Sequence, residues 1–163
     1  MTRAIALALL LLALRCDAAP ELKPFDAKSL DRARAMLRGR PFVIALWSVT
    51  CEPCREEMPL WRAMREKYPG IQILLVSADA PRDRSNVVRF LARYDPGSVE
   101  RWLFSDDFSE RLRYSIDRSW RGELPRTYFY DAEHHAVARS GVLDPAETEA
   151  WFARNAALNR ASR

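Results

Sequence analysis

The segment Cys51-Glu52-Pro53-Cys54 places two thiols three positions apart, a spacing that allows them to form a disulfide. A short apolar run over residues 42–47, rich in β-branched and aromatic residues, precedes the pair and predicts a buried strand. After the pair, apolar residues recur every three or four positions, which predicts a helix over residues 54–68 with one buried face. The two cysteines therefore lie where a strand ends and a helix begins.

This placement suits redox chemistry. The first turn of a helix has unpaired backbone N–H groups and the positive end of the helix dipole, and both stabilise a thiolate, the form that attacks disulfides. Cys51, at the helix entrance, is predicted to be the exposed nucleophile, and Cys54 the resolving thiol. Pro53 is tolerated in a first turn because its missing N–H would be unpaired there anyway. Pro59 is expected to kink the interior of the same helix.

A zinc site and inert core cysteines are the alternatives, because Cys-x-x-Cys also begins many zinc sites. A zinc site would need further ligands, and the remaining candidates are Cys16 and the adjacent pair His134 and His135. Adjacent residues on a strand point to opposite faces, so both histidines can hardly reach one metal. They are interpreted as surface turn residues, and redox chemistry is favoured over a metal site.

Length and composition indicate one compact domain. The chain has 163 residues, and its 48% hydrophobic and 29% charged content supports a real core with a solvated surface. The net charge of +4 comes from arginines scattered among acids, without a basic run or an aromatic-and-basic pattern. The composition therefore argues against disordered and fibrous classes, and no nucleic-acid partner is expected.

The N-terminus has the layout of a secretory signal peptide. A positively charged start precedes an apolar run over residues 4–14 that is too short to span a bilayer comfortably, and small residues follow it. We expect cleavage after Ala18, which removes residues 1–18 as the signal peptide. An uncleaved membrane anchor remains an alternative, as does a lipidated Cys16, although Arg15 stands where such a signal needs a small residue.

Removal of that segment would leave a mature chain, residues 19–163, with one pair of cysteines, Cys51 and Cys54. One pair so close in sequence is not the framework of a disulfide-stapled protein. Closing so short a loop also adds little stability by the loop-entropy argument. Redox turnover explains the pair better than structural need does.

The elements that must position the pair alternate along the chain, and no internal repeat or long linker interrupts them. Residues 20–25 are expected to be an extended lead-in. Further strands are predicted over 71–78, 102–104, 126–131 and 136–142, and further helices over 29–38, 85–94, 108–116 and 145–158. This order predicts an α/β fold with a mostly parallel central sheet, helices on both faces, and a C-terminal β-hairpin plus helix.

Two motifs in the right order resemble the thioredoxin superfamily, and more narrowly the exported TlpA/ResA-like thiol–disulfide oxidoreductases, which include reductases of cytochrome c maturation. The first is Trp47-x-x-x-Cys51-Glu52-Pro53-Cys54-x-x-Glu57-x-Pro59. The second, Leu124-Pro125-Arg126-Thr127-Tyr128-Phe129-Tyr130-Asp131, is similar to the family's cis-proline loop and following strand. The resemblance covers residues 25–155 and implies a thioredoxin-like fold with a mixed sheet.

The resemblance also implies site roles. Cys51 would attack a partner disulfide and Cys54 would resolve the mixed disulfide, with Trp47, Glu52 and Pro53 as supporting residues of the motif. The Cys51–Cys54 disulfide would be the redox group, with no cofactor and no metal.

The same resemblance implies roles for two more distant residues. Pro125 would be cis and lie across from the cysteines, leaving its neighbours' backbone free to pair with a partner chain. Glu57 would modulate a thiol pKa or shuttle protons, the alternative being an ordinary solvated carboxylate. Two departures are Ala45, where thioredoxins proper carry a buried acid, and Thr50, where many relatives carry Trp.

These observations favour a periplasmic reductant of protein disulfides, with cytochrome c maturation or metal-site assembly as its candidate processes. The acids Glu52, Glu56 and Glu57 should disfavour the thiolate whose stabilisation makes oxidants strong, whereas Arg55 should favour it. A reductant would take electrons from a membrane thiol donor, and we expect a monomer. The alternative function is a copper-handling accessory protein that uses both cysteines as soft ligands.

Overall fold

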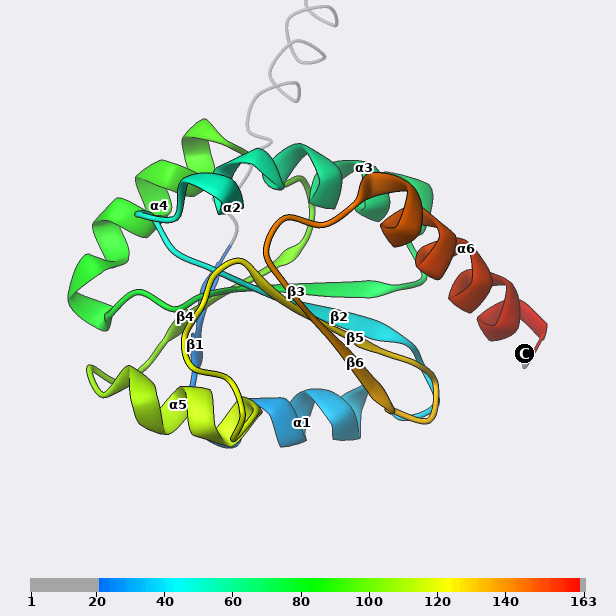
Figure 1. The fold of residues 1–163 in the computed structure, drawn as a ribbon, viewed down its shortest axis with the longest axis horizontal. Helices are drawn as coiled ribbons and strands as arrows, with labels where there is room; N and C mark the ends of the chain where they lie inside the picture. The colour runs from blue at the N-terminus through cyan, green and yellow to red at the C-terminus, as the bar shows by residue number, and fades with distance from the viewer. Residues whose placement is uncertain (1–20, 162–163) are drawn as a thin grey trace, which may run out of the picture.

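A six-stranded sheet forms the centre of the computed structural model, which describes residues 21–161 (Figure 1). The strand order is β1-β4-β3-β2-β5-β6. Strands β1, β2, β3 and β4 run parallel to one another, β5 is antiparallel to β2, and β6 is antiparallel to β5. The strands are β1 (Leu22–Phe25), β2 (Phe42–Trp47), β3 (Gln72–Ser77), β4 (Glu100–Phe104), β5 (Arg126–Tyr130) and β6 (Ala136–Ser140). The predicted mixed sheet with its C-terminal hairpin is confirmed.

Helices cover both faces of this sheet, as predicted. Figure 1 shows α1 and α5 on one face, and α2, α3, α4 and α6 on the other. The helices are α1 (Ser29–Met36), α2 (Glu52–Glu56), α3 (Met58–Lys67), α4 (Arg84–Arg93), α5 (Ser109–Ile116) and α6 (Pro145–Ala161), with a 3₁₀ turn, η2 (Pro81–Asp83). The parallel connections require these helices, because a crossover between parallel strands must pass over a face of the sheet.

The uninterrupted apolar run of β2 is explained by burial on both faces of the sheet, since all of its residues are buried. Alternate side chains enter two separate cores. One core contains Val43 and Ala45 with residues of α2, α3, α4 and α6, and the other contains Phe42 and Ile44 with residues of α1 and α5. The strand that leads to the cysteines is therefore held rigidly from both sides.

The single helix predicted over residues 54–68 is wrong in one respect, because two helices meet at Glu57. Pro59 lies in the first turn of α3 and not in a helix interior, so its missing N–H leaves no gap in the helical hydrogen bonds. The lead-in expected at residues 20–25 also contains a strand, because β1 pairs in parallel with β4.

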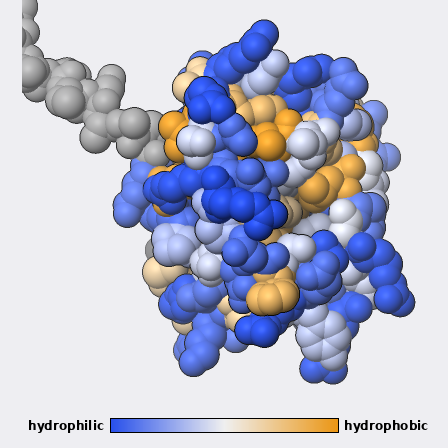
Figure 2. Space-filling model, turned by 90° about the vertical axis from the view of Figure 1, so that its left-hand side faces the viewer, coloured by the Kyte–Doolittle hydropathy of each residue, from blue (hydrophilic) through white to orange (hydrophobic). Residues whose placement is uncertain are grey.

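One face of the molecule (Figure 2) agrees with the solvated character expected from composition. The face seen in Figure 2 is mostly hydrophilic, with a limited group of apolar side chains in its upper half. Among residues 21–161, no helix combines the length and apolar character needed to cross a membrane. The predicted signal peptide, residues 1–18, lies outside the described residues.

Candidate functional site

The two cysteines lie at the end of β2, in the oxidised state, joined as a disulfide with their Cα atoms 5.3 Å apart. Cys51 is the N-cap of α2, and its Sγ accepts a hydrogen bond from the Cys54 N–H at 3.2 Å. Cys51 is half-buried, whereas only 1% of Cys54 is exposed. Cys51 is therefore nearer the surface than Cys54, although less exposed than predicted, and the roles of nucleophile and resolving thiol stay predictions. The N–H that reaches Cys51 Sγ is positioned to stabilise a thiolate there after reduction.

The loop before Cys51 is anchored by Asp79, a residue that the sequence reasoning did not single out. Its Oδ2 accepts hydrogen bonds from the Val49 N–H at 3.0 Å and from Ser77 Oγ at 2.6 Å. Burial raises the pKa of this carboxyl group. The sequence did carry a signal for this role, because Asp79 is a polar residue just after β3, the strand next to β2. The C-terminal ends of neighbouring parallel strands lie at the same edge of a sheet.

Glu57 is buried at the junction of α2 and α3, with 4% of its surface exposed. Its Oε1 accepts a hydrogen bond from the Leu143 N–H at 2.8 Å, and burial raises its pKa to about 7. The alternative of a solvated carboxylate is therefore wrong. Helical spacing carried the signal, since Glu57 lies four residues before the buried Trp61 and seven before the buried Met64.

The other acids near the cysteines differ from Glu57. Glu52 is exposed and pairs with Arg55 at 2.8 Å, and Glu56 is exposed. The Arg55 guanidinium also lies 5.7 Å from the centre of the Tyr94 ring. Of the three acids expected to disfavour the thiolate, one is therefore paired with Arg55, one is solvated and one is buried.

Trp47 and Pro53 occupy different parts of the site. Trp47 is 2% exposed and packs on Phe90, with their ring centres 4.7 Å apart. Its Nε1 has no hydrogen-bond partner within residues 21–161. Pro53 is exposed in the first turn of α2. Trp47 thus belongs to the buried core next to the loop before Cys51, whereas Pro53 contributes to the surface beside Cys51.

Pro125 follows a cis peptide bond, as the resemblance implied. The next residue, Arg126, is opposite Leu46 in the antiparallel pairing of β5 with β2, so Pro125 lies at the end of the sheet where β2 leads into the cysteines. Leu124, which precedes it, is half-buried, and its backbone forms no hydrogen bond within residues 21–161. Its backbone N–H and carbonyl groups are therefore not used by the hydrogen bonds of the sheet.

The histidines lie at the opposite end of β5, in the loop that leads to β6. His135 is exposed and contacts Asp131 at 3.3 Å, whereas His134 Nε2 lies 3.0 Å from the Leu37 carbonyl oxygen. Within residues 21–161, the one group of three or more histidine, cysteine or acidic side chains close enough to share a metal is Asp131, Glu133 and His135, and neither cysteine belongs to it. Interpretation of the histidines as loop residues agrees with these positions.

Curated proteins provide a sequence comparison, although no protein-family model matches the chain. The chain is 24% identical over 93 residues to the thiol-disulfide oxidoreductase YkuV of Bacillus subtilis, covering 57% of each protein. It is 27% identical over 118 residues to the thiol-disulfide oxidoreductase ResA of Geobacillus thermodenitrificans, covering 69% of this chain and 61% of that protein. The matches thus span about three fifths of the length of these relatives.

Solved structures provide a comparison of the fold. A secreted Mycobacterium tuberculosis disulfide oxidoreductase homologous to E. coli DsbE matches with a TM-score of 0.60 and 19% identity, covering 74% of this chain and 85% of that one. A thioredoxin-family thiol:disulfide interchange protein from Chlorobium tepidum matches with a TM-score of 0.61 and 16% identity, covering 76% and 84%. The predicted thioredoxin-like fold is confirmed, and the curated relatives confirm the resemblance in sequence.

Proposed function

We propose that this chain, which resembles the TlpA/ResA-like thiol–disulfide oxidoreductases in sequence and has a thioredoxin-like fold, is itself an enzyme that reduces disulfides in partner proteins. One observation carries the proposal. Cys51 is half-buried at a helix N-terminus, and its sulfur accepts a hydrogen bond from the Cys54 N–H. Cys54 itself is buried. This arrangement separates an attacking sulfur from a resolving sulfur within one turn of helix.

The proposed reaction starts from the reduced protein. The Cys51 thiolate attacks one sulfur of a partner disulfide, forming a mixed disulfide and releasing the other partner sulfur as a thiolate, which takes up a proton. The Cys54 thiolate then attacks Cys51 Sγ, forming the Cys51–Cys54 disulfide and releasing the second partner thiol. Two electrons and two protons thereby pass to the partner, and the redox group is the cysteine pair itself.

Glu57 is proposed to accept the proton that Cys54 must lose before it attacks. Its backbone N–H contacts the Cys54 carbonyl oxygen at 3.3 Å, which places the residue one turn beyond Cys54. Burial raises its pKa to about 7, so the carboxyl group exchanges protons near neutral pH. An ordinary solvated glutamate would remain ionised at that pH and would be a much weaker base.

The net direction is proposed to be reduction, with a membrane thiol protein as the electron donor. Cell compartments that form disulfides already hold strong oxidants, so a second redox pair there is most useful as a source of electrons. We propose that residues 1–18 direct export to the periplasm and are removed, and that the mature protein acts as a monomer.

Reduction of insulin disulfides in the presence of dithiothreitol tests the proposal. We expect catalysis by the wild type and its loss in Cys51→Ser. Wild-type protein that is no faster than dithiothreitol alone would overturn the proposal. Binding of one Cu(I) per chain without any disulfide turnover would instead support the copper-handling alternative.

A further inference from the structure

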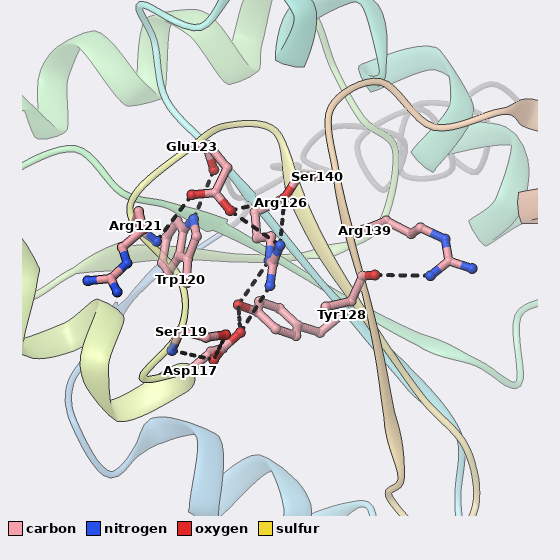
Figure 3. Close-up of polar contacts among 10 residues, drawn as sticks. Asp117, Ser119, Trp120, Arg121, Glu123, Arg126, Tyr128, Arg139 and Ser140 are labelled. Atoms are coloured by element: carbon pink, nitrogen blue, oxygen red, sulfur yellow. Dashed lines mark hydrogen bonds and ion pairs between the residues drawn. The ribbon is translucent and has the colours of Figure 1, made fainter.

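The loop between α5 and β5, residues 117–125, carries Pro125 at its end and is held by a polar network around Arg126 (Figure 3). This loop has no regular secondary structure of its own. Such a segment normally has several conformations unless side chains fix it. The position of residues 117–124, which precede Pro125, therefore depends on the side chains that hold them.

The Arg126 guanidinium contacts groups from three separate segments. Nη2 donates to Asp117 Oδ2 at 3.0 Å, where the loop begins, and Nη1 lies 3.3 Å from Glu123 Oε1, near the loop's end. Nη1 also donates to Ser140 Oγ on β6 at 2.5 Å, and Nε donates to Tyr128 Oη on β5 at 3.1 Å. One side chain thus joins both ends of the loop to two strands of the sheet.

The acceptors are themselves fixed by further hydrogen bonds. Tyr128 Oη donates to Asp117 Oδ2 at 2.9 Å, and Ser140 Oγ donates to Glu123 Oε1 at 3.0 Å. The middle of the loop is tied as well, because Trp120 Nε1 donates to the Glu123 carbonyl oxygen at 2.9 Å. Figure 3 shows the side chains of Asp117, Glu123, Tyr128 and Ser140 gathered around Arg126. The network leaves the loop few alternative positions.

The charges in the network are stable at neutral pH. Partial burial opposes ionisation of Asp117, but hydrogen bonds from Ser119, Tyr128 and Arg126 dominate and lower its pKa to about 2. The Arg126 side chain is only 13% exposed, and that of Asp117 21%. A charge pair so shielded from water is stronger and more directional than the exposed pairs elsewhere on the surface.

The sheet register connects this network to the site. Arg126 directly follows Pro125, and its backbone is paired with Leu46, next to Trp47 at the end of β2. The Pro125 carbonyl oxygen accepts a hydrogen bond from Gly141 at 2.9 Å, so its orientation is set by the same two strands. Displacement of the Arg126 side chain would free the loop on the side where a partner chain would meet Leu124.

We propose that Arg126 is a positioning residue, which holds the loop of residues 117–125 so that a polypeptide disulfide is presented to Cys51. This inference depends on the proposed function. A small disulfide needs only the sulfur of Cys51, whereas a polypeptide must also dock against the loop. Arg126 should therefore affect the reduction of protein disulfides and leave the reduction of small disulfides nearly unchanged.

The test compares Arg126→Met and Arg126→Lys with the wild type. Arg101→Met is the matched control, because the Arg101 side chain is also shielded, at 10% exposed, and pairs with Asp95 at 3.1 Å. Each reduced protein is assayed for kcat/KM with insulin and for its rate constant with glutathione disulfide. Hydrogen–deuterium exchange of the oxidised proteins reports on the loop directly, without any activity.

For Arg126→Met we expect a fall in kcat/KM of about tenfold with insulin, mainly through KM, and a change of less than about twofold with glutathione disulfide. Amides of residues 117–124 should exchange faster than in the wild type, and Arg126→Lys should lie between the two because it keeps the charge but not the fork of donors. Arg101→Met should match the wild type in both assays.

Two results would overturn the inference. Unchanged exchange in residues 117–124 would show that Arg126 does not hold the loop. An equal fall with insulin and glutathione disulfide would show an effect on the thiols and not on docking. Failure of the proposed function would be distinct, because the wild type would then reduce neither disulfide, whereas the exchange comparison would still decide whether Arg126 holds the loop.

Discussion

Replacement of Glu57 by Gln should make the protein more stable than the wild type at alkaline pH, and about equally stable at acid pH. The perturbation is small in shape, because Gln keeps an oxygen that can accept the Leu143 N–H now bound at 2.8 Å. It removes the ability to ionise. The difference between the two proteins therefore isolates the cost of a buried negative charge at the junction of α2 and α3.

The structure gives the size and sign of the effect. Burial raises the pKa of Glu57 from 4.5 to about 7, and at about 1.4 kcal/mol for each pKa unit this corresponds to about 3 kcal/mol. Between these two pH values the unfolded chain has lost the proton and the folded chain keeps it. The free energy of unfolding of the wild type should therefore fall as pH rises through this interval. Glu57→Gln has no such contribution, so its advantage should grow to about 3 kcal/mol above pH 7.

Urea unfolding on both sides of the interval measures this difference. The Cys51–Cys54 disulfide is kept intact throughout, so that the cysteines do not titrate. Glu56→Gln is the matched control, because Glu56 is the adjacent acid and is exposed, and we expect it to change the free energy of unfolding by less than about 0.5 kcal/mol at any pH. Parallel pH profiles for Glu57→Gln and the wild type would refute the reasoning, because they would mean that Glu57 ionises as easily in the folded chain as in water.

Two further predictions concern the cysteines and their loop. Asp79→Ala removes the acceptor of the Val49 N–H, so urea unfolding should show a free energy of unfolding lower by about 1–3 kcal/mol. Asp79→Asn keeps an acceptor and should lose less stability. Equal losses in the two variants would contradict the anchoring role. After reduction, the rate of alkylation of Cys51 by iodoacetamide should rise with pH with a midpoint below the usual thiol pKa of about 8.5, and Cys54 should be protected. Peptide mapping across pH measures both cysteines. A midpoint for Cys51 at or above about 8.5 would contradict stabilisation of its thiolate by the helix N-terminus.

Much of the site could be predicted from local sequence. The run of buried residues in β2, the change of period after Cys54, and the proline before β5 are signals within short windows. The structure places the strand and the cis proline as expected, whereas the single helix expected after Cys54 is divided at Glu57. Strand β1 was harder to predict, because its Lys23 and Pro24 resemble a loop and its pairing with β4 is decided by tertiary contacts.

Two features of the site depend on contacts far apart in sequence. The helical spacing of Glu57 could have indicated its burial, but its partner Leu143 lies beyond the end of β6, and no local pattern connects the two. The network of Arg126 likewise needs Asp117 and Ser140, which meet only when β5 and β6 pair. Local patterns therefore identified the two cysteines, whereas the partners of Glu57 and Arg126 emerged only from the fold.

Capture of a partner on Cys51 tests the central claim most directly. Reduced Cys54→Ser is mixed with a disulfide-bonded peptide, and the products are mapped by mass spectrometry without reductant. We expect one peptide thiol joined to Cys51, released by dithiothreitol, and no such adduct with Cys51→Ser. No adduct with Cys54→Ser, or equal capture by both variants, would contradict the claim that Cys51 attacks partner disulfides.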